Sequence, residues 1–333
     1  MPPATILKFP TSSPADTTPL TRLQEAGFKT QDILGIVGKT EGNGCVNDFS
    51  RTLSSHVWDA LIPETAISIF SGGTEGVLSP HVTCILESYE PTGLNAAVTR
   101  SRVLEPWEVG TAEHAKAVTE SIRETMIEEN IQPGDVRLVL VKCPLLTSER
   151  IATIQGSGRK PVTLDTYESM ALSRYASAIG IGAAIETFLE PQIPYLLSKG
   201  DFQTPFASCS SGAELEDCHI LILSDSRYTP SPPAPLLRTF TSTLNTAIDF
   251  PSLQALLTKA LTPTAPYTTA TLLQVFAKAE ANPSGLVGGR FRHTMLTDSD
   301  LHSTRHARAA VGGLIAGVTG DCWVYVSGGA EGT

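Results

Sequence analysis

Basic residues are scarce in this chain of 333 residues. Lysine and arginine together number 24 against 34 aspartates and glutamates, which gives a formal net charge of −10 and an isoelectric point near 5.2. A protein that binds nucleic acid needs a basic face to meet the phosphates. The composition therefore argues against a nucleic-acid partner and favours a small or neutral ligand.

Long apolar runs and paired cysteines are also missing. No segment approaches the roughly 18 consecutive apolar residues of a membrane span, and the N-terminal segment lacks a basic start followed by an apolar stretch. The six cysteines show no Cys-x-x-Cys spacing, and several lie in apolar runs such as HVTCILES. We expect a cytoplasmic protein with no membrane partner, whose cysteines are reduced and buried.

What the chain does contain is an internal repeat. Three residues recur in the same order: a lysine that closes an apolar run, an arginine that follows serine or threonine, and a serine in a Gly-rich motif that ends in glutamate. The three sets are Lys39, Arg51 and Ser71; Lys142, Arg174 and Ser210; and Lys278, Arg305 and Ser327. Repetition of a whole set of polar residues predicts structural symmetry with a shared centre.

Each copy of the repeat is as large as a domain. The lysines recur at intervals of roughly 100 residues or more, well beyond the roughly 20 to 50 residues of a solenoid repeat. We place three units at residues 1–100, 101–232 and 233–333, with the second boundary in a proline-rich stretch. An apolar run follows the first serine motif but not the third, so we expect the third unit to lack its C-terminal segment.

Apolar, β-branched runs alternate with helical patterns. From their β-branched content and flanking turn residues, we expect strands at 32–39, 65–73, 81–89, 136–143, 218–226, 271–278 and 322–329. Helices are expected at 111–129, at 165–187 with Asp165 as the N-cap, and at 299–317. The alternation predicts a mixed α/β fold.

The repeated residues suit attack on a carbonyl carbon. Serine becomes a good nucleophile when a neighbour takes its proton, and a lysine can do so only if its pKa falls from about 10.4 towards neutrality. Lysines and arginines gathered around one partly buried centre repel each other and so favour the neutral amine. A glutamate four residues after each serine would offset part of the charge and orient the lysines: Glu75, Glu214 and Glu331.

Glycines and arginines complete a cage. A glycine beside each serine lets backbone N–H groups approach an oxyanion, and arginines offer planar donors to carbonyl oxygens. We therefore expect a site for a small, flat molecule with carbonyls on several sides. Copies one and three read Ser-Gly-Gly, whereas copy two reads Ser210-Ser211-Gly212, so the odd second copy is the candidate for the chemistry.

Six segments carry a family resemblance: GKTEGNGCVNDFSR, SGGTEGVLSPH, VKCPLLT, SMALSRYASAIG, HTMLTDSDLHSTRHARAAVGG and SGGAEG. From about residue 31 to its end, the chain closely resembles the cyanuric acid hydrolase and barbiturase family of ring-opening amidohydrolases. The resemblance implies three homologous α/β units around a pseudo-threefold axis, with an inner β-barrel and outer helices. It also implies a homotetramer that hydrolyses an amide bond of a cyclic imide.

The resemblance further implies a role for each repeated residue. Lys142 would be the general base and Ser210 the nucleophile that opens cyanuric acid to carboxybiuret, which loses carbon dioxide to give biuret. No cofactor would take part in this chemistry. The other substrate-binding residues would be Lys39, Arg51, Ser71, Gly72, Arg174, Ser211, Lys278, Arg305, Ser327 and Gly328.

The family members also resemble one another in a Mg or Ca ion near the third unit, which we expect here in a structural role. Glu280 matches the glutamate ligand and Ala330 the first backbone ligand. The chain departs from the pattern because it ends in Gly-Thr where the family continues with a Gly/Pro-rich stretch. His302 and His306 are spaced like metal ligands on a helix, but no third ligand motif accompanies them, so we expect surface residues.

Two alternatives stay open. Barbituric acid replaces one ring nitrogen of cyanuric acid by carbon and keeps three carbonyls, so a barbiturase that yields ureidomalonate would use the same residues. A non-catalytic protein on this scaffold would instead bind a planar cyclic imide without consuming it. All three Ser-Lys pairs are intact, which favours an enzyme because a binding protein has no need of activated serines.

Overall fold

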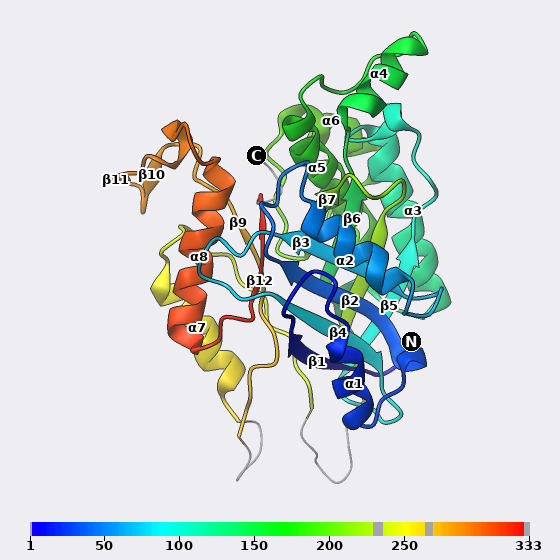
Figure 1. The fold of residues 1–333 in the computed structure, drawn as a ribbon, viewed down its shortest axis with the longest axis vertical. Coiled ribbons are helices and arrows are strands. Elements are labelled where there is room, and N and C mark those ends of the chain that lie inside the picture. Colours follow the sequence, from blue (N-terminus) through cyan, green and yellow to red (C-terminus); the bar gives the residue numbers. More distant parts are fainter. Residues whose placement is uncertain (1, 229–235, 264–268, 330–333) are drawn as a thin grey trace.

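The computed structural model describes residues 2–228, 236–263 and 269–329. Its strands are β1 (Ala4–Pro10), β2 (Ile33–Thr40), β3 (Ile67–Gly72), β4 (His81–Glu87), β5 (Leu94–Arg100), β6 (Val136–Pro144), β7 (Ala207–Gly212), β8 (His219–Asp225), β9 (Phe276–Ala279), β10 (Leu286–Val287), β11 (Phe291–Arg292) and β12 (Tyr325–Gly328). Its helices are α1 (Thr18–Glu25), α2 (Phe49–Asp59), α3 (Ala112–Glu128), α4 (Ser148–Gly156), α5 (Thr166–Ala184), α6 (Ile193–Lys199), α7 (Phe250–Leu261) and α8 (Ser303–Thr319). Figure 1 shows how they are arranged.

Two four-stranded sheets share one plan. Their strand orders are β1-β4-β2-β3 and β5-β8-β6-β7, with one parallel pair (β2 with β3, β6 with β7) and antiparallel neighbours beyond it. Strands β9 and β12 form a third parallel pair. These sheets, with their helices, confirm the mixed α/β fold. Within the described ranges the hydrogen-bonded strands do not form a closed barrel.

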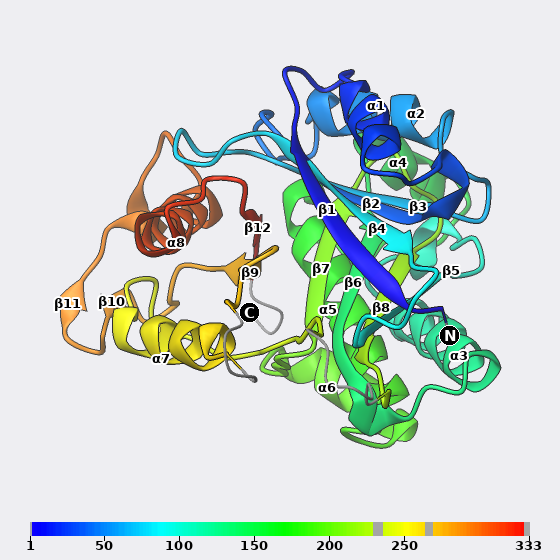
Figure 2. The same cartoon turned by 90° about the horizontal axis from the view of Figure 1, so that it is seen from below.

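Continuous apolar runs place β2 and β6 at the centre of the molecule. Nearly every residue of these strands is buried, as expected of strands that are covered on both faces. The faces of the first two sheets and β12 that point inward meet in one apolar cluster, which contains Val37, Ile69, Leu140, Leu221 and Tyr325. Figure 2 shows β9 and β12 beside β7, which agrees with the contacts between these strands.

Helices cover the outer faces of the sheets. Trp58 of α2 packs against the first sheet, α3 and α5 pack together against the second, and α7 and α8 cover the β9–β12 pair. The helix that carries Arg174 begins where the sequence predicts, because the Asp165 side chain accepts hydrogen bonds from the backbone N–H groups of Tyr167 and Glu168. A left-handed Gly320 ends α8.

The expected elements are confirmed, although several others were not foreseen. All seven expected strands are present, but β9 and β12 are shorter than predicted, and β1, β5 and β7 were not anticipated. Along the chain, the last strand of the first sheet ends at Glu87 and the first strand of the second sheet begins at Leu94. Residues 94–100 therefore pair within the second sheet, whereas the predicted boundary at residue 100 places them in the first unit. The predicted boundary at 232 lies outside the described residues.

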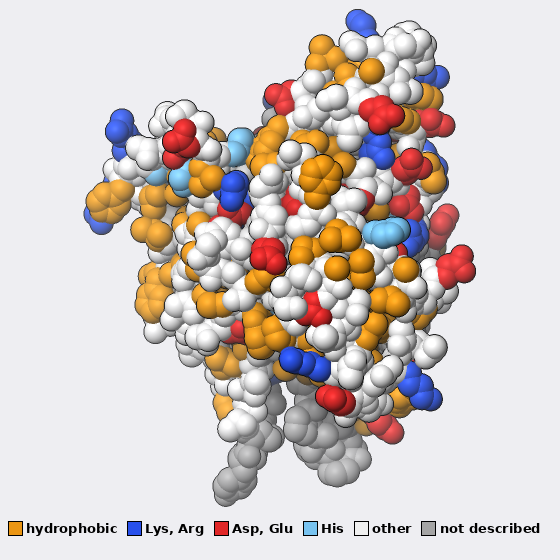
Figure 3. Space-filling view, viewed as in Figure 1, with side chains coloured by type: hydrophobic (Ala, Val, Ile, Leu, Met, Phe, Trp, Pro, Cys, Tyr) orange, Lys and Arg blue, Asp and Glu red, His pale blue; other side chains and the backbone are white. Residues whose placement is uncertain are grey.

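The surface and the cysteines bear on the other expectations. Cys84, Cys143, Cys209 and Cys218 are buried as predicted, Cys45 is half-buried, and Cys322 is exposed, so the expectation of burial is wrong for Cys322. No helix among the described residues is long and apolar enough to cross a membrane. On the face shown in Figure 3, acidic and basic side chains are interspersed.

Candidate active site

Each lysine of the repeat lies opposite its serine near the carboxyl end of a parallel strand pair. Lys39 is the register partner of Ser71, Lys142 of Ser210 and Lys278 of Ser327. Carboxyl ends of parallel strands meet at one edge of a sheet, where polar side chains collect into sites. All three serines, together with Lys39 and Lys142, are buried. The structure thus brings together the three Lys-Ser pairs that the sequence predicts.

Hydrogen bonds from the lysines link the three strand pairs in a ring. Each Nζ donates to the carbonyl oxygen of the residue after its own serine: Lys39 to Gly72 at 3.1 Å, Lys142 to Ser211 at 3.0 Å and Lys278 to Gly328 at 2.9 Å. Each also donates to the residue before a serine on a different sheet: Lys39 to Val326 at 2.5 Å, Lys142 to Phe70 at 2.6 Å and Lys278 to Cys209. The first pair therefore binds the third, the second binds the first and the third binds the second.

The serine hydroxyls are less equivalent than the lysines. Lys39 Nζ lies 3.3 Å from Ser71 Oγ, whereas the buried Oγ atoms of Ser210 and Ser327 have no hydrogen-bond partner among the described residues. A buried hydroxyl without a partner costs about 1–3 kcal/mol. Two of the three hydroxyls are therefore available to a ligand, and the Lys142–Ser210 hydrogen bond needed for proton transfer is not formed in this structure.

A small cavity of about 30 Å³ lies between these serines. Nine of the twelve sequence-predicted site residues line it: Arg51, Ser71, Gly72, Lys142, Arg174, Ser210, Ser211, Ser327 and Gly328. Lys39 and Lys278 lie behind their serines and do not line the cavity. Sequence reasoning missed five further lining residues: Gly44, Tyr167, Met170, Thr304 and Arg308.

The third arginine of the cavity is Arg308 and not Arg305. Arg308 is buried, its Nη1 donates to the Gly72 carbonyl at 3.0 Å, and its Nη2 lies 2.5 Å from the Glu75 carboxylate. Arg305 also pairs with Glu75, at 2.9 Å, but does not line the cavity. Both arginines belong to α8, one turn apart. The Ser/Thr-Arg pattern predicted Arg305. In the structure the two arginines differ in burial, because Arg308 is buried and lines the cavity whereas Arg305 is half-buried and does not line it.

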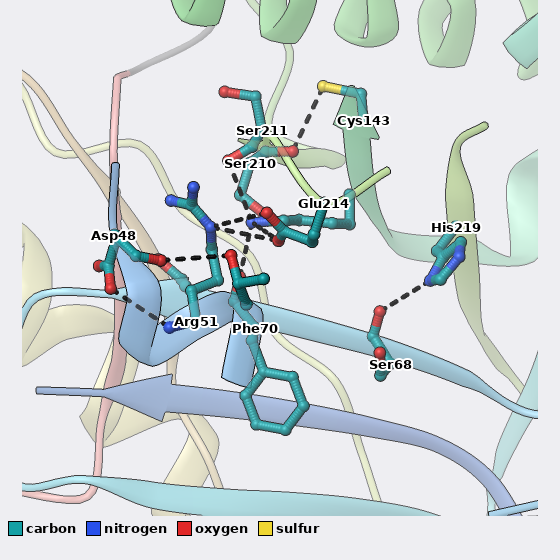
Figure 4. Close-up of polar contacts among 12 residues, drawn as sticks. Asp48, Arg51, Ser68, Phe70, Cys143, Ser210, Ser211, Glu214 and His219 are labelled. Atoms are coloured by element: carbon teal, nitrogen blue, oxygen red, sulfur yellow. Dashed lines mark hydrogen bonds and ion pairs between the residues drawn. The ribbon is translucent and has the colours of Figure 1, made fainter. Parts of the chain in front are cut away.

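Two of the repeated glutamates pair with the arginines across sheets. Glu214, from the second unit, lies 3.1 Å from Arg51 Nε and 3.5 Å from Lys142 Nζ, and Figure 4 shows Arg51 and Glu214 pointing toward one another. Glu75 instead pairs with Arg308 and Arg305. Among the described residues, Glu214 forms an ion pair with its repeat lysine, whereas Glu75 pairs with arginines and acts on Lys39 only through its nearby charge. Glu331 lies outside the described residues.

Burial lowers the pKa of Lys39 and Lys142 and so favours their neutral amine forms. It lowers the pKa of Lys142 to about 7; Glu214 opposes the shift and the Arg51 charge adds to it. Burial, assisted by the charge of Arg308, also lowers the pKa of Lys39 well below its usual value. A base is most effective when its pKa lies near the working pH, because it is then unprotonated and still accepts a proton readily. The pKa of Lys142, near 7, suits that task.

Buried histidines occupy the same position on the neighbouring strands. His81 is the register partner of Lys39, and His219 of Lys142. The Nδ1 atom of His219 lies 2.9 Å from the Ser68 carbonyl oxygen on the first sheet, a contact visible in Figure 4. Burial lowers the pKa of both histidines, to about 4 for His81. They are therefore neutral near pH 7 and act as packing and hydrogen-bonding groups between the sheets.

Gly72 allows two parts of the first unit to approach closely. A Cβ atom there would lie 1.6 Å from Asp48 Oδ2, and Asp48 caps α2 by accepting a hydrogen bond from the Arg51 backbone N–H. Glycine is thus required where the start of α2 meets β3. The equivalent residue of the second unit is Ser211, whose Oγ points instead toward the Met170 carbonyl oxygen at 3.4 Å.

The residues expected to hold a metal ion are only partly described. Gly328 pairs with Ala279, so Glu280 lies at the end of the β9–β12 register. Among the described residues no group of three or more histidine, cysteine, aspartate or glutamate side chains is placed to hold a metal ion. Ala330 lies outside the described residues. His302 is the N-cap of α8 and His306 pairs with Asp298 at 2.9 Å, in agreement with their expected surface roles.

Comparison with known proteins identifies the family. Residues 5–333 match the sequence profile of a family described as amidohydrolase ring-opening protein. The chain therefore belongs to the ring-opening amidohydrolases, enzymes that hydrolyse C–N bonds of cyclic amides.

Individual relatives support the same assignment over nearly their whole length. The chain is 55% identical to a cyanuric acid amidohydrolase of Sarocladium sp, with 100% of this chain and 95% of the relative covered. It is 49% identical to a cyanuric acid amidohydrolase of Pseudonocardia dioxanivorans, with 98% and 93% covered. A solved structure described as cyanuric acid hydrolase superposes with a TM-score of 0.87 at 36% identity, covering 100% of this chain and 96% of that one.

The lowered pKa of Lys142 predicts a specific pH dependence of stability. Lys142 titrates near pH 7 in the folded protein, whereas a lysine in the unfolded chain titrates near 10.4, so between these values the unfolded chain binds the additional proton. Relative to Lys142→Met, the free energy of unfolding of the wild type should rise with pH by up to about 1.4 kcal/mol per unit over this window. Urea unfolding between about pH 6 and about pH 9 measures the difference.

The matched control is Lys160→Met, because Lys160 is exposed. This variant should keep the pH dependence of the wild type. Identical curves for the wild type and Lys142→Met would show that the pKa of Lys142 is not lowered by folding.

Proposed function

We propose that this protein is a cyanuric acid amidohydrolase. The observation that carries the proposal is the 55% identity, over the full chain, to a relative named for that activity, together with three Lys-Ser pairs around one cavity. Cyanuric acid has three equivalent carbonyls on a flat ring. A ring of three serines and three arginines offers one set of donors to each carbonyl.

The proposed architecture is three units around a pseudo-threefold axis, with the strands inside and the helices outside. Its support is the shared strand order of the first two sheets and the cyclic lysine hydrogen bonds, which repeat with the same partners from unit to unit. One similar solved structure is described as an evolutionary innovation by structural concatenation, which suits this plan. The axis would pass between the three serines.

In the proposed first step, neutral Lys142 takes the proton of Ser210. The freed Oγ attacks one ring carbonyl carbon, and the carbonyl π electrons move to its oxygen, which becomes an oxyanion. Backbone N–H groups of the Ser-Ser-Gly segment would stabilise the oxyanion. Burial lowers the pKa of Lys142 to about 7, with Glu214 opposing and Arg51 adding to the shift, so the amine can accept the proton and later return it.

In the second step, the tetrahedral intermediate collapses and the ring C–N bond breaks. The proton on Lys142 passes to the departing ring nitrogen, leaving an acyl group on Ser210. A water molecule, deprotonated by Lys142, then hydrolyses this ester and regenerates the serine. The product is carboxybiuret, which loses carbon dioxide to give biuret.

The first and third pairs would hold the other two carbonyls of the ring. Ser71 with Gly72 and Ser327 with Gly328 line the cavity on these sides. Arg51, Arg174 and Arg308 line it as well and would bind the edges of the ring, with Arg308 in the place first given to Arg305. Lys39 and Lys278 would polarise their serines from behind.

The direct test is turnover of purified protein on cyanuric acid and on barbituric acid, followed by loss of ring absorbance. We expect loss of cyanuric acid. Loss of barbituric acid alone would make the protein a barbiturase that uses the same residues. Tight binding by calorimetry without consumption of either compound would favour a binding protein.

Substitution tests the assignment of roles. Ser210→Ala and Lys142→Ala should each lower kcat by about 10² or more, because each removes a group that takes part in bond formation. Ser327→Ala is the matched truncation at an equivalent position and should act mainly on KM. Retention of more than about a tenth of kcat by Ser210→Ala, or a larger loss in Ser71→Ala, would move the chemistry away from the second pair.

The pH profile tests the role of Glu214. The carboxylate of Glu214 raises the pKa of Lys142, so Glu214→Gln should lower that pKa and move the ascending limb of kcat/KM to lower pH. The wild-type limb should have its midpoint near pH 7. Glu108→Gln is a control, since Glu108 pairs with Arg102 far from the cavity lining, and it should leave the limb in place. A shift to higher pH in Glu214→Gln would contradict the assignment.

We also propose that a Mg or Ca ion binds Glu280 and stabilises the third unit without taking part in the chemistry. The described residues supply one carboxylate for such an ion and no cluster of three. A chelator should therefore lower the thermal midpoint while turnover at ambient temperature persists. Complete loss of turnover that only the metal restores would contradict a structural role.

The homotetramer that the family resemblance implies also stays a prediction. Light scattering on the eluting protein tests it, and a mass of one 35.4 kDa chain would exclude it under those conditions.

A further inference from the structure

Tyr325 lies directly below the three serines, although neither the repeat pattern nor the cavity lining includes it. It precedes Ser327 by two residues on β12, so both side chains lie on the same face of the strand. Its ring is fully buried in the apolar cluster where the sheets meet, with its centroid 5.8 Å from that of Phe276. Lys39 Nζ lies 6.0 Å from the centroid of the Tyr325 ring.

The hydroxyl of Tyr325 reaches the three serines from the side of the apolar core. It lies beside the hydroxyls of Ser71, Ser210 and Ser327, one from each strand pair. It makes a regular hydrogen bond to none of the described residues, and the same is true of Ser210 Oγ and Ser327 Oγ. Burial raises the pKa of Tyr325 to about 12, so the group remains a hydroxyl donor throughout the neutral range. Three buried hydroxyls that lack partners thus share one small space.

This hydroxyl breaks the threefold pattern. Counting two residues back from the serine gives Ile69 on β3, Ser208 on β7 and Tyr325 on β12. Ile69 has no polar group, and Ser208 lines a different cavity, next to β9. Among the three equivalent positions, only the one on β12 carries a side chain that is both long enough and polar enough to reach all three serines.

We propose that Tyr325 is a positioning residue, whose hydroxyl donates a hydrogen bond to Ser210 Oγ when Lys142 takes the serine proton. This inference rests on the proposed function of the Lys142–Ser210 pair. Before the proton leaves, Ser210 Oγ makes no regular hydrogen bond to a described residue, although the Tyr325 hydroxyl lies beside it. Once it has left, a donor from below satisfies one lone pair of the oxygen and leaves another directed into the cavity. The serine is then held in the orientation for attack.

Tyr325→Phe tests the proposal, because it removes the oxygen and keeps the ring that packs in the core. We expect kcat to fall about tenfold, the effect of one lost hydrogen bond of about 1.4 kcal/mol, with KM within about twofold. The midpoint of the ascending pH limb should not move, since that limb reports Lys142. The thermal midpoint should change little or rise, because an unpaired buried hydroxyl has been removed.

The matched control is Ser208→Ala. It removes a buried, unpartnered hydroxyl at the equivalent position of the second unit, away from the three serines, and should leave kcat and KM unchanged. An unchanged kcat in Tyr325→Phe would overturn the proposal. So would a shifted pH limb, which would make Tyr325 a proton-transfer group, or a loss of kcat that only follows a large drop in thermal midpoint.

A second measurement separates this proposal from the proposed function. Methanesulfonyl fluoride labels activated serines, and peptide mass spectrometry gives the rate at which Ser210 is labelled without any cyclic imide present. We expect slower labelling of Ser210 in Tyr325→Phe than in the wild type and in Ser208→Ala. Should the wild type open neither ring, the proposed function fails, while the labelling rates still test Tyr325. Equal rates in all three proteins, or no labelling in any, would refute its role.

Discussion

The structure depends on the three lysines that bind carbonyl oxygens of two sheets at once. A buried amine needs hydrogen-bond acceptors, and each of these lysines finds two of them in carbonyls on either side of the serines. Because one carbonyl comes from the neighbouring sheet, no unit can bury its lysine alone. The same bonds that join the units therefore also place the serines around a common cavity, so assembly of the fold and assembly of the site are one event.

Symmetry and asymmetry have separate consequences in this arrangement. The repeated lysines, serines and arginines give every side of the cavity the same donors, which suits a ligand whose three carbonyls are alike. In the proposed mechanism, the serine of one unit attacks one carbonyl. Two differences lie at the second serine: Glu214 forms an ion pair with its lysine, and Ser211 replaces glycine. A third, the Tyr325 hydroxyl of β12, lies beside all three serines. In the proposed mechanism, these local differences on a symmetric frame would select one of three equivalent bonds.

The sequence predicted the parts of this molecule that apolar burial and repetition determine. Strands such as β2 and β6 are continuous apolar runs, and the three Lys-Ser pairs recur in order, so both were found. Strand β7 was missed because its residues, ASCSSG, are small and polar and owe their burial to the sheet on either side. Arg308 was missed because its sequence context differs from that of Arg51, although its depth in the molecule is the same. Neither the cyclic lysine bonds nor the place of Tyr325 leaves a local signal, since both arise from contacts between units.

The starting points of three helices explain why Arg308 corresponds to the other two arginines. Arg51 is the third residue of α2, Arg308 the sixth of α8 and Arg174 the ninth of α5. The helices thus begin about one turn further from the arginine in each case, while the arginine itself stays at the cavity. The added turns of α5 extend about 9 Å beyond the equivalent end of α2 and carry Tyr167 and Met170 to the rim. There the Tyr167 hydroxyl lies 2.9 Å from the Thr304 hydroxyl of α8, so the two longer helices are joined by a hydrogen bond at the cavity. A ligand edge that faces α5 and α8 therefore meets the side chains of Tyr167, Met170 and Thr304 in addition to the arginines of these helices.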